Sequence, residues 1–238
     1  MSRKMDNLKH YNDIGISNEL DWERIEHLFR IGFFGALLSF IGDMMLGWGV
    51  EDESLAGILR LLSAYTGHSD GKIFAVALLG LFGMTLEGLS FFSVYRLIAS
   101  KSMKLAHTYH SGILGYTIFG GCGYHIPVCA AVFLMKHGFA SDLILKYMLY
   151  FVLPGVALFM IFFIVLLIAQ IKAFATGMTP YPKWCAIFSI LFGFLIAVIA
   201  SLSGNHAWAN AVYCAWLGIG NLWMFGGLMV LAKKLPHD

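Results

Sequence analysis

The chain has 238 residues, of which 59% are hydrophobic and 13% are charged, and its formal net charge is +2. A soluble domain usually carries about 25% charged residues, so this composition excludes an ordinary soluble protein and predicts a membrane protein in contact with lipid. The net charge is small and no run of basic residues occurs, which excludes a nucleic-acid partner.

Six segments are long and apolar enough to cross a bilayer, which requires about 20 mostly apolar residues. In chain order they are 29–50, 73–96, 107–135, 143–170, 183–203 and 209–232. The expected fold is therefore all-α, a polytopic transmembrane helical bundle with six spans. An N-terminal segment, 1–28, precedes the transmembrane domain 29–232, and a short tail, 233–238, follows it.

Two amphipathic segments outside these spans are too short to cross the membrane. Residues 18–28 place Trp22, Ile25 and Leu28 at helical spacing between charged residues, which predicts a helix at the membrane interface. Residues 54–66 are amphipathic, with Arg60 near their middle, and are expected to form a helix that lies on, or dips into, the outer leaflet. A crossing by residues 54–66 would add a seventh span, and that alternative stays open.

The distribution of basic residues predicts the orientation of the spans. If the N-terminus is inside, four of the 16 Lys and Arg residues lie outside, namely Arg60, Lys72, Lys136 and Lys146, and twelve lie inside. Cytoplasmic loops carry the excess of Lys and Arg. We therefore expect both termini in the cytoplasm and a multi-pass location in the cell membrane.

Two carboxylates lie within the predicted spans, where a charged side chain is costly and usually faces protein or water. Asp43 shares a helical stripe with Ser39 and several glycines, and Glu87 shares one with Gly80 and Gly83. Both carboxylates are therefore predicted to face the bundle interior. Glu87 lies deeper toward the inner side, so we do not expect a direct carboxylate pair.

The third span contains the unusual sequence IFGGCGYHIPVC, residues 118–129. Its glycines weaken a helix, and Pro127 removes a backbone donor, so a kink or an unwound turn is expected there. His125 lies within this break, in the same outer half of the membrane as Asp43. In the sixth span, Asn210 and Tyr213 are expected to form the wall of an outer pocket with Asp43 and His125.

These polar residues support three hypotheses on function. The leading one is a protein that binds or transports a small molecule or ion, without a cofactor or metal, through a site containing Asp43, Ser39, His125, Asn210, Tyr213 and Glu87. The second is a metal-dependent intramembrane hydrolase, whose ligands would be His125, Asp43, Cys129 and His206. The third is an accessory protein without a ligand, in which the polar residues only stabilise helix packing. No span contains an interior Lys, which excludes a retinal protein because retinal needs a buried Lys.

The sequence GDMMLGW, residues 42–48, ends the first span. With this sequence and the layout of its spans, the chain resembles a group of uncharacterised small bacterial integral membrane proteins. The resemblance implies a membrane location and no particular activity. The chain lacks the late HxxxH pair of the alkaline ceramidase and progestin-receptor-like superfamily.

Overall fold

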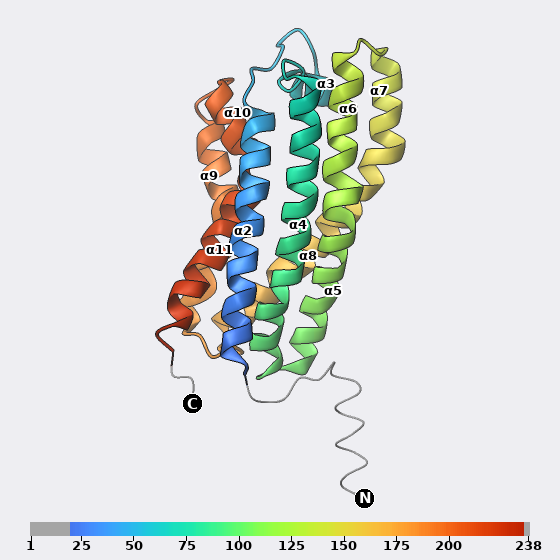
Figure 1. Cartoon of the computed structure of the whole chain (residues 1–238). Coiled ribbons are helices and arrows are strands. Elements are labelled where there is room, and N and C mark those ends of the chain that lie inside the picture. Colours follow the sequence, from blue (N-terminus) through green and yellow to red (C-terminus); the bar gives the residue numbers. More distant parts are fainter. Residues whose placement is uncertain (1–19, 236–238) are drawn as a thin grey trace, which may run out of the picture.

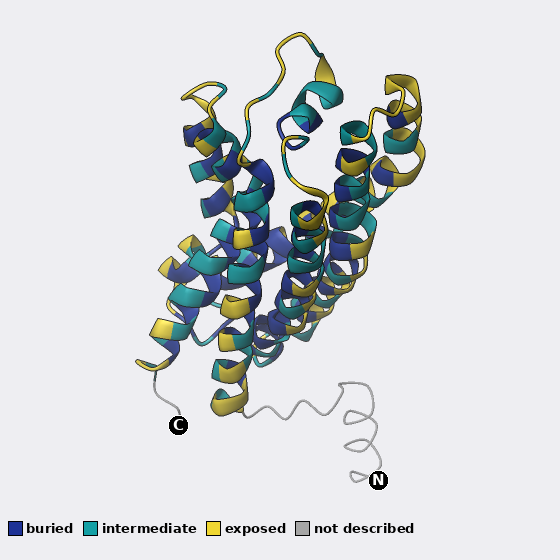
Figure 2. Ribbon diagram, turned by 45° about the horizontal axis from the view of Figure 1, so that its top comes forward, coloured by how far each residue is buried: buried dark blue, intermediate teal, exposed yellow. Residues whose placement is uncertain are grey.

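The computed structural model describes residues 20–235, and in this range the chain is all-α. Long helices run side by side along one axis (Figure 1). Buried residues gather on the faces that the helices turn toward one another, and exposed residues lie on the outside (Figure 2). The helices are α2 (Trp22–Gly47), α3 (Gly57–Ser63), α4 (Asp70–Ala99), α5 (Met103–Gly120), α6 (Ile126–Lys136), α7 (Ser141–Tyr147), α8 (Leu153–Ala175), α9 (Leu191–Ser201), α10 (Ala207–Cys214) and α11 (Trp216–Ala232).

Four helical stretches are long and apolar enough to cross a membrane: Trp22–Gly47, Asp70–Ala99, Met103–Lys136 and Ser141–Ala175. A fifth candidate is the pair α10 and α11, which is bent by 57° at the residue between them. These helices are those of a multi-pass membrane protein. The expected first four spans therefore each correspond to one long helical stretch, and the expected last span corresponds to the bent pair.

The expected fifth span, 183–203, is not one continuous helix. It consists of a 3-10 turn, η3 (Lys183–Ile187), followed by α9, which has 11 residues. Side chains stabilise the irregular backbone between them, because Trp223 donates to the Ile187 carbonyl at 2.9 Å and Gln170 donates to the Phe188 carbonyl at 3.0 Å. These donors satisfy carbonyl groups that an apolar environment would otherwise leave unpaired.

The first span and the residues before it form a single helix. Asp21 caps α2 by accepting a hydrogen bond from the Arg24 backbone N–H at 2.9 Å, so residues 22–28 of the expected interfacial helix continue directly into the span. Residues 18 and 19 of that helix lie outside the described residues. Close packing of α2 on α4 depends on Gly35, where an added Cβ would lie 2.8 Å from Leu86 Cβ.

The break expected in the third span takes the form of a π-helical turn, η1 (Gly121–His125). A second π-helical turn, η2 (Met148–Val152), joins α7 to α8. Each turn ends two residues before a proline, Pro127 or Pro154. A wider turn accommodates the ring and the missing donor of proline without ending the helix. The third span therefore remains helical through the break. The extra residue in the π-helical turn rotates the side chains that follow it relative to those of α5.

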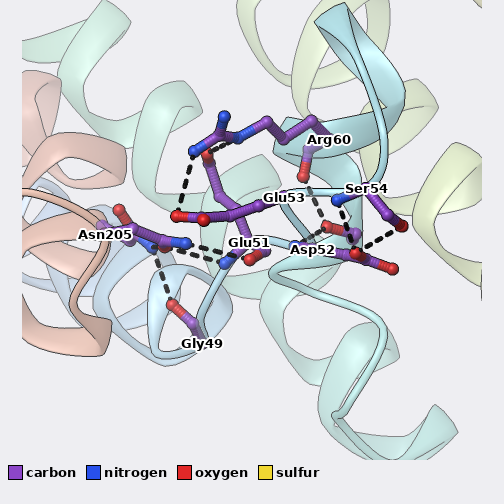
Figure 3. A network of polar contacts seen from close by, with 9 residues as sticks. Gly49, Glu51, Asp52, Glu53, Ser54, Arg60 and Asn205 are labelled. Atoms are coloured by element: carbon purple, nitrogen blue, oxygen red, sulfur yellow. Dashed lines mark hydrogen bonds and ion pairs between the residues drawn. The ribbon is translucent and has the colours of Figure 1, made fainter.

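The segment 54–66 contains one short helix, α3 (Gly57–Ser63), at the opposite end of the bundle from the start of α2 (Figure 1). With seven residues, α3 is too short to cross a membrane, so the structure does not support a seventh span. A polar network holds this region (Figure 3): Arg60 pairs with Glu51 at 2.7 Å, and the Asn205 amide bonds both the N–H and the carbonyl of Glu51 at 2.9 Å.

Candidate ligand-binding site

A cavity of about 540 Å³ lies inside the bundle beneath α3. Residues from α2, α3, α4, η1, α6, α7, η2, α8, α10 and α11 contribute to its wall. Most of the lining side chains are aliphatic, and no Lys or Arg is among the described residues that line it. Its ionisable or polar side chains are Ser39, Asp43, Tyr65, Tyr124, His125, Cys214 and Trp216.

Asp43 and His125 meet at the wall of this cavity. The Oδ1 atom of Asp43 lies 3.7 Å from Nδ1 of His125, and both side chains are largely buried. The other ring nitrogen of His125, Nε2, lies 3.0 Å from the backbone carbonyl oxygen of Val76 on α4. The imidazole rests on Gly80, where an added Cβ would lie only 2.1 Å from Nε2. A glycine at position 80 is thus required for His125 to approach α4.

The contact with Val76 determines which nitrogen of His125 carries a proton. A carbonyl oxygen only accepts hydrogen bonds, so Nε2 of His125 must be the donor. In a neutral imidazole the remaining nitrogen, Nδ1, is then an acceptor, and it faces the Asp43 carboxylate. The distance of 3.7 Å is longer than a direct hydrogen bond. The pair therefore presents two acceptors to the cavity unless a proton or another donor joins them.

Glu87 forms a second buried polar cluster. Its Oε2 atom accepts a hydrogen bond from the Tyr116 hydroxyl, which in turn accepts one from the Asn221 amide at 3.1 Å. Glu87, Tyr116 and Asn221 are all fully buried. Glu87 Oε1, Asn221 Oδ1 and the Ser39 hydroxyl have no hydrogen-bond partner among the described residues.

The two clusters lie at different depths. On α2, Gly35 packs against Glu87 and Gly42 packs against Val76, so Asp43 lies eight residues, or about 12 Å, along the helix from the level of Glu87. The carboxylates do not form a direct pair, as expected. Ser39 lies between these levels, lines the cavity and packs against Gly83.

Asn210 and Tyr213 do not line the cavity of Asp43 and His125. They line a separate depression at the end of the bundle, together with Glu51 and Arg60. Tyr65 and Leu61 belong to both walls and stand between the two spaces. The Asn210 amide donates to the Gly49 carbonyl at 2.9 Å, so it holds the loop after α2 in place. The expected single outer pocket is therefore divided into two by the segment containing α3.

Tyr116 is the partner of Glu87 that the sequence did not indicate, because a tyrosine in an apolar span carries no distinctive signal. Asn221, a polar residue within a span, did carry such a signal. The residues proposed for a metal centre are not gathered in one place: Cys129 and His206 do not line the cavity. The described residues contain no group of three or more His, Cys, Asp or Glu side chains placed to hold a metal.

The fold and the cavity define a multi-pass helical membrane protein with a polar site inside its bundle. Residues 5–235 match the sequence profile of a family described as "Family of unknown function (DUF6796)". The match covers nearly the whole chain, and the protein belongs to this family. No curated protein and no solved structure matches the chain. The family description names no activity.

Proposed function

We propose that this protein binds a small molecule in the cavity beneath α3, with Asp43 and His125 as its polar contacts. One observation carries this proposal: two ionisable side chains that are 82 residues apart in sequence meet at 3.7 Å in the wall of an otherwise mostly apolar space. The cavity volume of about 540 Å³ lies in the range typical of small-molecule sites, roughly 300–1,000 Å³. Such sites combine an apolar lining with a few polar groups.

The proposal includes six crossings with both termini in the cytoplasm. The start of α2 and the end of α11 lie at the same end of the bundle (Figure 1), and η3 with α9 would make the fifth crossing. The twelve-to-four division of basic residues assigns that end to the cytoplasm. The cavity then opens in the outer half of the membrane.

The same site could also serve transport. A proton or cation would then move between the Asp43–His125 pair and the Glu87 cluster. Ser39 lies between Asp43 and Glu87 on the path toward the inner side, and its hydroxyl has no partner among the described residues. Hydrogen-bonding side chains at successive depths are typical of proton relays in transporters. Glu87 would be the inner acid of this relay.

Native mass spectrometry of the purified protein tests the binding proposal. Membranes are extracted in a mild detergent, and the mass of each chain is measured with whatever it retains. We expect a species bound at one per chain in the wild type, lost in Asp43→Asn and in His125→Ala. Asp142→Asn is the matched control, because Asp142 is exposed and pairs only with Lys146 among the described residues.

A bound species that persists at the same occupancy in both cavity variants would contradict the proposal. So would a wild type that retains nothing while Asp43→Asn lowers its free energy of unfolding. In that case the polar residues would only support packing, as in an accessory protein.

A further inference from the structure

We infer that the ligand of this cavity is a lipophilic amine, a molecule with a protonated amino group and an apolar body. The inference rests on the proposed binding function and names its ligand class. Three features of the described residues lead to it: the hydrogen-bonding character of the Asp43–His125 pair, the charge of the lining, and the position of the cavity next to the outer surface of the bundle.

The Asp43–His125 pair can accept hydrogen bonds from a ligand in the cavity. Because Nε2 of His125 donates to Val76, Nδ1 of the neutral ring is an acceptor, and Oδ1 of Asp43 is an acceptor when a bound cation keeps the carboxylate ionised; the two atoms lie 3.7 Å apart. A single ammonium nitrogen at the usual hydrogen-bond distance of about 2.9 Å can reach both atoms. An ammonium group has three N–H donors and no acceptor, so it satisfies both acceptors at once.

The charge of the lining selects a cation over an anion. Asp43 is the one carboxylate that lines the cavity, and no Lys or Arg is among the described residues of its wall. A bound carboxylate or phosphate would meet Asp43 with no fixed positive charge to offset the repulsion. An ammonium group would instead form a charge-assisted hydrogen bond, which is stronger than a bond between neutral groups.

The apolar part of the ligand is indicated by the wall formed by α7, η2 and α8. Leu145, Leu149 and Leu153 lie one helical turn apart, line the cavity, and are each about half exposed on the outside of the bundle. One stripe of leucines therefore contacts both the cavity and the surroundings of the protein. In a membrane these surroundings are lipid, so an apolar molecule can pass this edge without crossing water.

Competition among three probes with the same chain tests the ligand class. Dodecylamine, dodecanol and dodecanoate are added in equal amounts at pH 7.5, and native mass spectrometry resolves which complex forms. We expect the amine to bind about tenfold more tightly than the alcohol, since a bond to a charged group is the stronger one. Dodecanoate should bind least.

Variants separate the head-group contact from the apolar path. Asp43→Asn should lower amine binding to the level of the alcohol, whereas Asp43→Glu, which keeps the charge, should retain part of the preference. Leu149→Trp should weaken binding of all three probes by narrowing the edge of the cavity. The exposed-site variant Asp142→Asn should change nothing.

Two results would overturn the inference, and only the second would also contradict the proposed binding function. If the alcohol or the carboxylate binds best and Leu149→Trp blocks it, the amine class is wrong and the binding function stands. If no probe binds and the wild type also retains no species from the membrane, both the inference and the proposed function fail.

Discussion

Gly80 and His125 fit together so closely that the histidine occupies the space where a side chain at position 80 would begin. A Cβ on Gly80 would lie 2.1 Å from the imidazole, far closer than non-bonded heavy atoms approach one another. Gly80→Ala must therefore displace His125 from the Val76 carbonyl. We expect ligand binding to fall at least tenfold and the free energy of unfolding to fall by about 1–3 kcal/mol, the usual effect of overpacking.

The control for this variant lies on the same helix. Gly71 has no atom within 4 Å of the position of an added Cβ, so Gly71→Ala should leave binding unchanged. Unfolding by titration with SDS in mixed micelles measures the stability of both variants. Equal binding by Gly80→Ala and the wild type would show that His125 does not need its position against α4.

Glu87 is expected to be uncharged in the folded protein. It is fully buried, and none of the ion pairs among the described residues includes it. A fully buried carboxylate that has no counter-charge, and that does not line the cavity where a cation could bind, is too costly to persist. Glu87→Gln should thus change the free energy of unfolding by less than about 1 kcal/mol, because a neutral amide replaces a neutral acid.

Removing the partner of Glu87 should cost more than removing its acidity. Tyr116→Phe leaves Oε2 of Glu87 and the Asn221 amide without their hydrogen bonds, at a cost of about 1–3 kcal/mol. Tyr150→Phe is the control, since Tyr150 is exposed. A larger loss for Glu87→Gln than for Tyr116→Phe, measured by the same SDS titration, would mean that Glu87 is ionised.

His68, in the loop before α4, makes the region around α3 sensitive to acid. Its Nε2 donates to the Leu46 carbonyl at 2.8 Å, and its Nδ1 accepts from the Lys72 ammonium at 3.0 Å. Burial lowers the pKa of His68, and the positive charges of Lys72 and Lys136 lower it further, while the bond to Leu46 raises it. The neutral ring of His68 is therefore the form that can make both hydrogen bonds.

The sign of the pH effect follows from this lowered pKa. The unfolded chain binds the proton near the ordinary histidine value of about 6.5, before the folded chain does, so stability falls as the pH drops below about 6.5. Hydrogen exchange of residues 48–69 should accelerate between pH 7 and pH 5 after correction for intrinsic exchange. His68→Gln should show a smaller change over this range. An identical pH response in wild type and variant would contradict this role.

The proposed six crossings predict opposite exposure for two loops. Ser69 precedes α4 and Ser102 follows it, so cysteines at these positions should lie on opposite sides of the membrane. In a background without the four native cysteines, an impermeant thiol reagent added to intact cells should label Ser69→Cys only. Labelling of both, or of Ser102→Cys alone, would refute the orientation.

Local features explain which parts of this structure were predictable from the sequence. The long apolar runs identified four spanning helices, because hydrophobic length is set by the bilayer. The stripe around Asp43 and the glycine-rich sequence before Pro127 predicted an inward carboxylate and an irregular turn at His125. The fifth segment was harder, since the bonds from Trp223 and Gln170 that stabilise its irregular backbone come from other helices, α11 and α8.

The composition of the cavity depended on contacts that sequence patterns do not encode. Asn210 lies on a suitable face, yet it binds the Gly49 carbonyl because the α3 segment folds between it and Asp43. The pairing of Glu87 with Tyr116 is equally invisible in the sequence, since it joins α4 to α5 across the core. The relative level of Asp43 and Glu87 and the meeting of Asp43 with His125 were predictable, whereas the other contacts between spans were not.

An experimental density map of the protein in lipid nanodiscs with dodecylamine tests the central claim most directly. Our account predicts density for an amino group between Oδ1 of Asp43 and Nδ1 of His125, with an apolar chain running toward Leu149. An Asp43–His125 pair that has closed to a direct hydrogen bond, with no density in the cavity around it, would contradict the account.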